Sequence, residues 1–394
     1  MENRGIEMIT VDELFALIDT TIASLPAINV PLDKTTGLRL EEQILAAEDE
    51  PAFDRSAMDG FAIAEDAQPG SFSIIGEILP GQAAMNNPDR GEAIRVFTGS
   101  ALPPKVKVVM QEDVTEKNGG LIIESLTNAG HVRHRGSALE KGNLLLSKNT
   151  ILSPASIALL ASAGVSKPRV IPRPQVAHLT TGSEIVPFSS VPKAGQIRNA
   201  NAPLIRALVE ATGAIYCAHY HVDESLASAM EACEHSLFQK ANLLLVSGGS
   251  SGGQHDHTAE LLEKLGFTLM CRTVNCRPGK PFILGVRGSQ VAIGLPGNPV
   301  SHFVTFHLFV RHVLSRLAGW RVTPKCTAIL REGEVLVLNQ RETFWPGSVK
   351  DSRVTPLPWL DSGHLAALLQ VNALIRIPAS TIPLVGSSVE IIPC

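Results

Sequence analysis

The chain has 394 residues, of which 44% are apolar and 5% aromatic, and its formal net charge is −4. This length favours two to four domains with aliphatic cores. The slightly acidic balance supplies no positive field for a polyanion, which argues against nucleic acid as the main partner.

The cysteines and the apolar runs bear on the compartment. Six cysteines are sparse for this length and form no close-spaced pair of pairs, which favours a reducing setting. Residues 1–25 lack the core of a signal peptide, and no apolar run approaches the roughly 20 residues of a membrane span. We therefore expect a soluble, cytoplasmic protein with no membrane partner.

The first 172 residues predict two helices on either side of a strand-rich insertion. Thr10 and Glu13 form a capping box ahead of a helix that we expect to run to about residue 24. Ser153 followed by Pro154 starts the second helix. Between them, short alternating apolar stretches are separated by Gly, Pro and Asn, which is typical of strands. These stretches are residues 72–78, 93–97, 106–110 and 121–124.

Strands and helices alternate after the prolines at 168, 172 and 174. The expected strands are 176–180, 214–219, 243–247, 282–286 and 291–294, and the expected helices are 202–212, a segment after 223, 258–265 and 300–317. This alternation predicts an α/β domain with a largely parallel sheet, whose ligands bind where loops leave the carboxyl ends of strands. After about residue 320 the chain returns to short strands, expected at 328–330, 335–338, 374–377 and 389–392.

The most informative segment is a buried strand that stops abruptly at glycines. Residues 243–247 lead into Gly248, Gly249 and Ser250, and Asp256 precedes the next helix. Glycines let main-chain N–H groups approach an anion, and a helix N-terminus adds donors and a positive dipole. A second strand–turn–helix follows, whose turn is Pro296, Gly297, Asn298 and Pro299. Two such loops predict one shared ligand crevice.

Two further loops supply charge at the same edge of the predicted sheet. Arg277 and Lys280 stand on a proline-flanked turn and can hold a phosphate or another oxyanion. Glu184, at the end of a loop that begins with Thr181 and Gly182, can hold a divalent cation together with Asp256. These parts together indicate a site for phosphoryl or oxyanion transfer.

Each of these residues also has a structural explanation. Glycine-rich turns without a P-loop lysine are common, and Asp223 stands where a helix N-cap is needed. The histidines at 219, 221, 255 and 257 fit no standard closed zinc site, and we expect them to lie on the surface. Cys271 and Cys276 flank strand-like residues, which predicts packed thiols.

Short motifs occur in a fixed order along nearly the whole chain. They are residues 53–62, 98–100, 108–112, 181–184, 246–256, 278–281, 294–301, 362–364 and 371–372. In this order they resemble the molybdopterin molybdenumtransferase (MoeA, or gephyrin E-domain) family. Each motif is weak by itself, and the ordered set is specific.

The resemblance implies a multidomain α/β and β fold in four parts. These are a segmented N-terminal domain (1–43 plus 140–172), an inserted β-rich domain (44–139), an α/β molybdopterin-binding domain with a parallel-rich sheet (173–322) and a C-terminal β-barrel-like domain (323–394). Members of the family are homodimers, in which the α/β domain of one subunit and the insertion of the other form the active crevice.

The resemblance also implies a transferase that inserts molybdate into adenylylated molybdopterin and releases AMP, the last step of molybdenum cofactor biosynthesis. Its cofactor is Mg²⁺, and the molybdopterin adenylyltransferase is a further candidate partner. Carried over residue by residue, the catalytic set is Asp59, Glu184, Asp223 and Asp256, with Asp256 and Glu184 as the metal ligands. The implied substrate-binding residues are Thr98, Thr181, Gly182, Gly248, Gly249, Ser250, Arg277, Lys280, Pro296, Gly297, Asn298 and Pro299.

This chain departs from the pattern of the family at several positions. Ala138 stands within the usual acidic pair, Thr273 replaces a usual lysine, Arg277 replaces a second lysine and Asn199 replaces an aspartate. Arginine can still hold an oxyanion, in a bidentate geometry. Two alternatives to a working enzyme therefore stay open: a divergent paralogue that binds molybdopterin or its nucleotide without efficient metal insertion, and a scaffold protein that uses the dimer surface. The preference between molybdate and tungstate also stays open.

Overall fold

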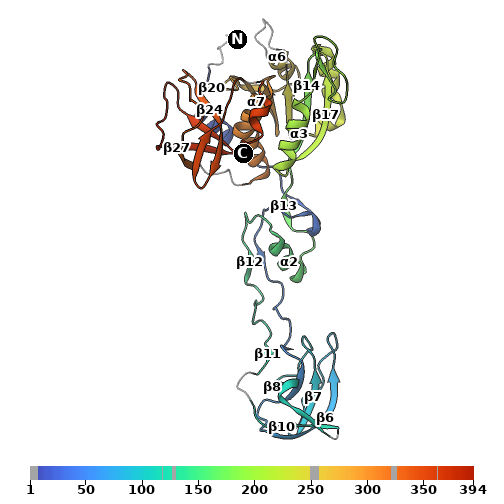
Figure 1. Cartoon of the computed structure of the whole chain (residues 1–394). Coiled ribbons are helices and arrows are strands. Elements are labelled where there is room, and N and C mark those ends of the chain that lie inside the picture. Colours follow the sequence, from blue (N-terminus) through green and yellow to red (C-terminus); the bar gives the residue numbers. More distant parts are fainter. Residues whose placement is uncertain (1–7, 118, 127–129, 249–256, 321–325, 362) are drawn as a thin grey trace. The chain divides into compact units, whose positions relative to one another are not determined.

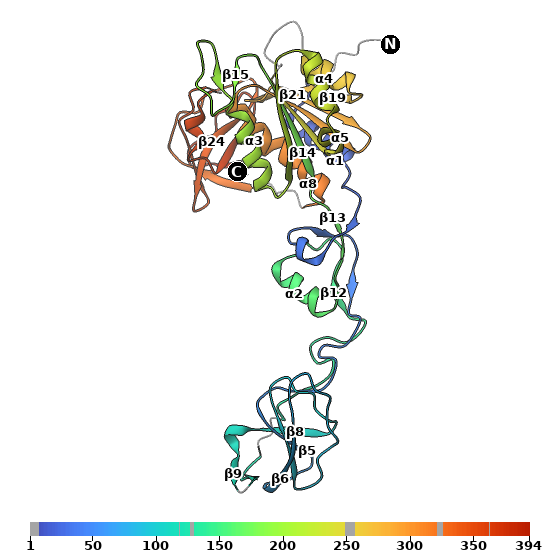
Figure 2. The ribbon, with the colours of Figure 1, turned by 90° about the vertical axis from the view of Figure 1, so that its right-hand side faces the viewer.

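The computed structural model describes residues 8–117, 119–126, 130–248, 257–320, 326–361 and 363–394 (Figures 1 and 2). The chain forms two compact units, one of Met1–Asn29, Gly37–Arg39 and Arg169–Cys394, and the other of Val30–Thr36 and Leu40–Pro168. Within the described residues, no helix is long and apolar enough to cross a membrane. The finer, four-part division stays a prediction.

The smaller unit contains the strand-rich insertion that the sequence predicts. Its six-stranded sheet has the order β8-β5-β7-β6-β10-β9. The strands are β5 (Gly60–Ala64), β6 (Gly70–Ile78), β7 (Glu92–Val96), β8 (Val106–Met110), β9 (Thr115–Lys117) and β10 (Gly120–Ile123). Alternation along β5 sends Phe61 and Ile63 into one apolar cluster and Ala62 into another, so the sheet has a core on each face. Helix α2 (Pro154–Ser162) begins at Ser153, whose hydroxyl accepts a hydrogen bond from Ser156 N, as predicted.

The larger unit is built on the predicted α/β sheet, whose order is β17-β14-β18-β22-β21-β19. The strands are β14 (Gln175–Thr181), β17 (Ile215–Val222), β18 (Leu243–Ser247), β19 (Thr268–Thr273), β21 (Pro281–Arg287) and β22 (Gln290–Leu295). The first four strands in the order pair in parallel, and β21 pairs antiparallel with both β22 and β19, so only β21 runs in the opposite direction. The parallel-rich sheet and the hairpin of β21 and β22 are therefore confirmed.

Helices cover both faces of this sheet. On one face, an apolar cluster joins Val176 and Leu245 of the sheet to five helical segments. These are α1 (Val11–Thr21), α3 (Asn201–Ala211), α7 (Pro299–Thr305), the π-turn Phe306–Val310 and α8 (Arg311–Ala318). On the other, α4 (Leu226–Glu234), α5 (Ser236–Lys240) and α6 (His257–Lys264) pack against Ala177 and Val246. Because neighbouring strand residues point to opposite faces, each strand feeds both layers. The helix expected over 300–317 is interrupted by one π-turn.

The last part of the larger unit is a closed β-barrel (Figure 1). Strands β24, β25, β23, β27 and β26 follow one another, and β26 pairs back to β24. Their bounds are β23 (Cys326–Leu330), β24 (Glu342–Lys350), β25 (Arg353–Pro356), β26 (Ala373–Ile377) and β27 (Ser388–Pro393), with β20 (Cys276–Arg277) added beside β24. The strand expected at 335–338 is wrong. Only Leu336 of that segment is buried, and Val335 is 77% exposed, because the ring of strands closes without it.

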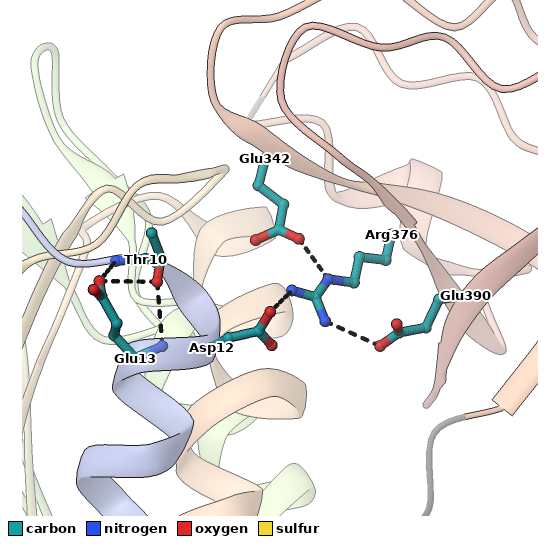
Figure 3. Close-up of polar contacts among 6 residues, drawn as sticks. All are labelled: Thr10, Asp12, Glu13, Glu342, Arg376 and Glu390. Carbon is teal, nitrogen blue, oxygen red and sulfur yellow. Dashed lines mark hydrogen bonds and ion pairs between the residues drawn. The ribbon is translucent and has the colours of Figure 1, made fainter.

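Helix α1 is tied to the barrel by an ionic cluster (Figure 3). The predicted capping box is present, with Thr10 N donating to Glu13 Oε2 at 2.7 Å and Glu13 N donating to Thr10 Oγ1 at 3.2 Å. Arg376 on β26 donates to Asp12 of α1 at 2.9 Å, to Glu390 of β27 at 3.1 Å and to Glu342 of β24. The helix ends at Thr21, earlier than expected, because Ile22 is already extended and Leu25 N bonds to Leu317 O of α8.

Short elements complete the described chain. They are β1 (Ile28–Asn29), the 3-10 turn Leu32–Lys34, β2 (Arg39–Leu40), β3 (Ile44–Leu45), β4 (Arg55–Ser56), the 3-10 turn Gln111–Asp113, β11 (Val132–Arg133), β12 (Leu144–Leu146), β13 (Arg169–Ile171), β15 (Ile185–Val186), β16 (Ile197–Arg198) and the 3-10 turn Leu365–Leu368.

Candidate functional site

A cleft of about 260 Å³ lies in the larger unit where β14, β18 and β22 end. This is the edge at which open α/β sheets bind ligands, because the loops that leave neighbouring parallel strands separate there. The described lining residues are Thr180, Thr181, Glu184, Ile185, Ile197, Arg198, Asn199, Ala200, Asn201, Glu224, Ser247, Gly248, Gly297, Asn298 and Pro299.

Two glycines of this edge stand where a side chain does not fit. Gly248 has φ +110°, and a Cβ atom there would lie 2.5 Å from Thr181 O. Gly182 has φ +142°, and its Cβ would lie 2.8 Å from Glu184 Oε2. The Gly248 carbonyl is held by Thr258 Oγ1 at 2.8 Å, at the start of α6. Glycine is therefore favoured at both positions by the positive φ, and at Gly248 also by the close approach of the Thr181 backbone.

The third wall of the cleft is formed by the start of α3 and the turn before α7. Asn201 Nδ2 donates to Gly297 O at 2.7 Å, which joins the two segments. Asn201 Oδ1 is buried and has no hydrogen-bond partner among the described residues. Asn199 caps the next turn by accepting from Ala202 N at 3.0 Å and donates to Thr180 Oγ1 at 3.2 Å. An orphaned carbonyl oxygen beside an open cleft is free to accept from a ligand or to bind a cation.

The structure brings some of the predicted site residues to this cleft. Those that line it are Thr181, Glu184, Gly248, Gly297, Asn298 and Pro299, with Gly182 beside Glu184 and Pro296 preceding the Gly297 turn. Gly249, Ser250 and Asp256 lie outside the described residues. The lining residues that were not predicted from the sequence include Arg198, Asn201 and Glu224. Arg198 and Asn201 could have been found, because they lie in a polar segment directly before a predicted helix.

Asp223, Arg277 and Lys280 are not among the described lining residues. Asp223 Oδ1 accepts from Ser225 N at 3.0 Å, and the N-cap of α4 is Ser225, so the expectation that Asp223 caps this helix is wrong. The guanidinium of Arg277 lies 5.4 Å from the centre of the Trp359 ring, a cation–π distance. Lys280 is exposed. Among the described residues, the cleft takes its positive charge from Arg198 instead.

Asp59 and Thr98 meet in the smaller unit. Asp59 Oδ1 accepts from Thr98 N at 2.7 Å and from Thr98 Oγ1 at 2.8 Å. These bonds, the backbone one above all, lower the pKa of the Asp59 carboxyl. The next residue, Gly60, must be glycine, because a Cβ atom there would lie 2.0 Å from Val109 O on the neighbouring strand. The pair therefore presents an ionised, oriented carboxylate at the start of β5.

Histidines gather beneath the cleft in a way that the sequence did not suggest. His178 and His302 are fully buried, and each lies 2.7 Å from Ser247 Oγ through its Nε2 atom. Burial lowers the pKa of His178 well below its ordinary value and that of His302 to about 4. His219 and His221 are exposed, as expected for surface histidines, and both bond to Thr180 Oγ1.

Cys271 and Cys276 are packed thiols, as the sequence predicts. Cys271 and Cys276 are buried, which raises the pKa of their thiols to about 11 and about 12. All six cysteines are free. In the part of the chain that the structure describes, no group of three or more His, Cys, Asp or Glu side chains could hold a metal ion by itself.

Comparison with known proteins gives a consistent result over most of the chain. Residues 9–164 match the model of the MoeA N-terminal region (domains I and II), and residues 177–316 match that of a probable molybdopterin-binding domain. The chain is 29% identical to the molybdopterin molybdenumtransferase of Staphylococcus epidermidis over 90% of its own length and 88% of that protein. It is also 29% identical to the Staphylococcus aureus enzyme, over 95% and 92% of the two chains.

Solved structures agree with the sequence comparison. Two crystal structures of the molybdopterin biosynthesis MoeA protein from Pyrococcus horikoshii superpose with TM-scores of 0.80 and 0.74. They are 28% and 26% identical to this chain, cover 98% of it, and are themselves covered over 99% and 100% of their lengths. The likeness therefore extends through the barrel as well as through the two regions that the family models match.

Proposed function

Because this chain belongs to the MoeA family of molybdopterin molybdenumtransferases, we propose that it inserts molybdate into adenylylated molybdopterin and releases AMP. The observation that carries the proposal is the cleft at the carboxyl ends of β14, β18 and β22, which combines the crowded Gly248, a guanidinium and two carboxylates. A substrate that joins a flat heterocycle to a phosphoanhydride needs both a backbone surface and fixed charges.

Arg198 is the residue that we assign to the anionic part of the substrate. Its Nε donates to Ser190 O at 3.1 Å, which fixes the guanidinium beside the cleft. A planar guanidinium binds phosphate or molybdate oxygens through paired N–H donors, and it stays charged at every relevant pH. Main-chain groups at Gly248, directly after β18, can approach the ligand closely because glycine has no side chain.

The oxygen atoms of the cleft fit a hard divalent cation such as Mg²⁺. Glu184 and Glu224 supply carboxylates, and the unpartnered Asn201 Oδ1 supplies a neutral oxygen on the same cleft. Mg²⁺ takes oxygen ligands and keeps several waters, so it does not require a closed cage of protein side chains. When bound, it would neutralise charge on the phosphoanhydride as AMP leaves. Asp256 is a further ligand in this proposal.

Asp59 and Thr98 act in the cleft of a second copy of the chain in our proposal. The lowered pKa of Asp59 keeps its carboxylate ionised, and Thr98 orients it through two hydrogen bonds. We therefore propose a homodimer with shared sites, which the molybdopterin adenylyltransferase supplies with substrate. Mixing Asp59→Asn and Glu184→Gln proteins tests the sharing, because heterodimers would contain one intact site. Activity no higher in the mixture than in either variant would contradict it.

The activity itself is tested by mixing the purified protein with Mg²⁺, molybdate and adenylylated molybdopterin and measuring AMP. We expect AMP release that depends on molybdate and that Glu184→Gln reduces by about 100-fold, the scale of removing one fixed catalytic group. Glu210→Gln, on the outer surface of α3, is the matched control and should leave the rate unchanged. No AMP from the wild-type protein would contradict the proposal.

A second function is favoured by the departures from the pattern of the family. Ala138 offers only its backbone N–H, which donates to Glu50 O, and Thr273 lies on β19 opposite Pro281. A chain that lacks these two charged groups could bind molybdopterin or its nucleotide as a carrier without inserting the metal. Tight binding of adenylylated molybdopterin in calorimetry with no AMP release would establish the carrier function instead.

A further inference from the structure

A continuous chain of hydrogen bonds runs beneath the cleft from β17 to the start of α7. Tyr216 OH lies 3.0 Å from His178 Nδ1, and His178 Nε2 lies 2.7 Å from Ser247 Oγ. The same Oγ lies 2.7 Å from His302 Nε2, and His302 Nδ1 lies 3.1 Å from Asn298 O. Two of the five, Ser247 and Asn298, line the cleft.

The chemistry of the last bond fixes the direction of all the others. Asn298 O is a carbonyl and can only accept, so His302 Nδ1 must carry a proton. Both imidazoles are fully buried and none of these bonds involves a carboxylate, so each ring is neutral and has one proton. His302 Nε2 is then a lone pair and must accept the hydroxyl proton of Ser247.

The remaining steps follow from the single proton of the serine. Since Ser247 Oγ–H is committed to His302, the bond to His178 is possible only if His178 Nε2–H donates to Ser247 Oγ. His178 Nδ1 is then a lone pair and accepts the proton of Tyr216 OH. Burial, which lowers the pKa of both imidazoles, agrees with this neutral arrangement. The position of every proton in this series of hydrogen bonds is therefore determined.

We propose that this fixed order makes Ser247 Oγ a hydrogen-bond acceptor only toward the cleft, so that the ligand group touching it is an N–H or O–H donor and not a phosphate or molybdate oxygen. A serine oxygen has one proton and two lone pairs. The proton and one lone pair are used within the chain, which leaves one lone pair. Because Ser247 lines the cleft and is only 3% exposed, we place no more than one ligand atom against it.

This inference rests on the proposed function and specifies how the substrate lies. The floor of the cleft at Ser247 takes an N–H donor on the edge of a heterocycle such as the pterin. The oxyanions lie toward Arg198, away from the lone pair that would repel them. The polarity of one hydroxyl thereby determines which end of the bound substrate lies at Ser247.

The proton order is tested directly by NMR of the protein labelled with ¹⁵N-histidine. Protonated and unprotonated ring nitrogens have well-separated ¹⁵N shifts, so the spectrum identifies each tautomer. We expect the Nδ1–H form for His302 and the Nε2–H form for His178 at neutral pH, assigned with His302→Leu and His178→Leu proteins. The opposite tautomer at either residue, or a doubly protonated ring, would overturn the inference.

The consequence for ligands is tested with two probes, pterin followed by its fluorescence and inorganic phosphate followed by calorimetry. In His302→Leu the Ser247 proton loses its acceptor and can turn to the cleft, so the preference for pterin over phosphate should fall about tenfold. In His178→Leu the proton stays on His302, and the preference should stay within about threefold of the wild-type value. Equal changes in the two variants would contradict the proposal.

Failure of this inference and failure of the proposed function are distinguishable. A wild-type protein that releases no AMP contradicts the function while leaving the tautomers and the ligand preference as predicted. A wild-type protein that releases AMP but has the other tautomers contradicts only the role of Ser247. If a leucine variant does not fold, the tautomers of the wild-type protein still decide, with its ring signals assigned from the through-space contacts of His302 with Asn298 and of His178 with Tyr216.

Discussion

Two groups of polar residues in the larger unit differ in the charge that they hold. The Arg376 cluster is Arg376 with Asp12, Glu342 and Glu390. The Ser247 cluster is the hydrogen-bonded series of Tyr216, His178, Ser247, His302 and Asn298. Burial by itself would lower the pKa of Arg376, but the hydrogen bonds that its guanidinium donates to Glu342, Asp12 and Glu390 outweigh burial and raise the pKa (Figure 3). In the Ser247 cluster, burial prevails and the histidines stay neutral. Opposite charges stabilise the Arg376 cluster, whereas hydrogen bonds between neutral groups stabilise the Ser247 cluster.

This difference teaches what each kind of cluster can do. An ionic cluster attracts from any direction, so it suits the joining of α1, β24 and β27, which come from distant parts of the chain. A neutral cluster has polarity instead, because each hydroxyl and imidazole must be either donor or acceptor. We therefore expect damage to the Arg376 cluster to reduce stability, and loss of His302 from the Ser247 cluster to change both the ligand preference and the pH dependence of stability.

Arg376→Met gives the largest expected effect. The side chain is 10% exposed, and its removal takes the Arg376 guanidinium away from Glu342 and Glu390, which are 15% and 26% exposed. Breaking such a pair costs about 3–5 kcal/mol. Urea unfolding should show this loss, while the pterin affinity of the folded protein is unchanged. The free energy of unfolding of Arg376→Lys should lie between those of the wild-type protein and Arg376→Met, since lysine restores the charge without the planar guanidinium. A loss below about 1 kcal/mol for Arg376→Met would contradict the distinction between the clusters.

The pH dependence of stability tests the Ser247 cluster in the same comparison. His302 has a pKa of about 4 in the folded protein against an ordinary value of 6.5, so the unfolded chain binds more protons between these pH values. The free energy of unfolding should therefore fall as the pH drops from 6.5 to 4, by about 3 kcal/mol for this group. His307, with a pKa of about 3, adds to the same fall.

Urea titrations at several pH values between 7 and 4 measure this fall. We expect His302→Leu to reduce the slope without abolishing it, because His178 and His307 remain. Arg376→Met should lower the whole curve and keep the slope that the histidines produce. The same slope in His302→Leu as in the wild-type protein would show that this imidazole does not stay neutral when folded.

The sheet and its helices could be predicted because their signals are local. Apolar runs of strand length, glycines at strand ends and capping residues gave β14, β18, α2 and the turn before α7 close to their observed bounds. The barrel was harder, because β24 contains Pro346 and Gly347, which normally argue against a strand. Its neighbour 335–338 has the composition of a strand but no partner in the closed ring.

The candidate site was predicted in part, and the missing part depends on the tertiary structure. Glycines and a carboxylate at strand ends identified Gly248 and Glu184, since topology alone brings such residues to one edge. His178 and His302 each look like an ordinary polar residue in an apolar element, and only the fold places both on Ser247. Arg198 was missed because Arg277 offered a more conspicuous cation in the sequence.

Tyr216→Phe is the third test and has a smaller expected effect. It removes the hydrogen bond to His178 Nδ1 at the half-buried end of the Ser247 cluster. This loss should lower the free energy of unfolding in urea by about 0.5–1.5 kcal/mol. The order of protons is set at the Asn298 end, so the preference for pterin over phosphate should not change. A change in that preference as large as in His302→Leu would mean that the tyrosine determines the order.

Asp12→Asn gives the smallest expected effect and separates the members of the ionic cluster. Asp12 is 64% exposed, whereas Glu390 is 26% exposed, so water screens the attraction between Asp12 and Arg376 more strongly. Removing the most solvated of the three carboxylates should cost only about 0–1 kcal/mol in urea unfolding, less at high salt. Glu390→Gln is the matched control and should cost more. If Asp12→Asn cost as much as Arg376→Met, the cluster would depend on its exposed member, and burial would not explain its strength.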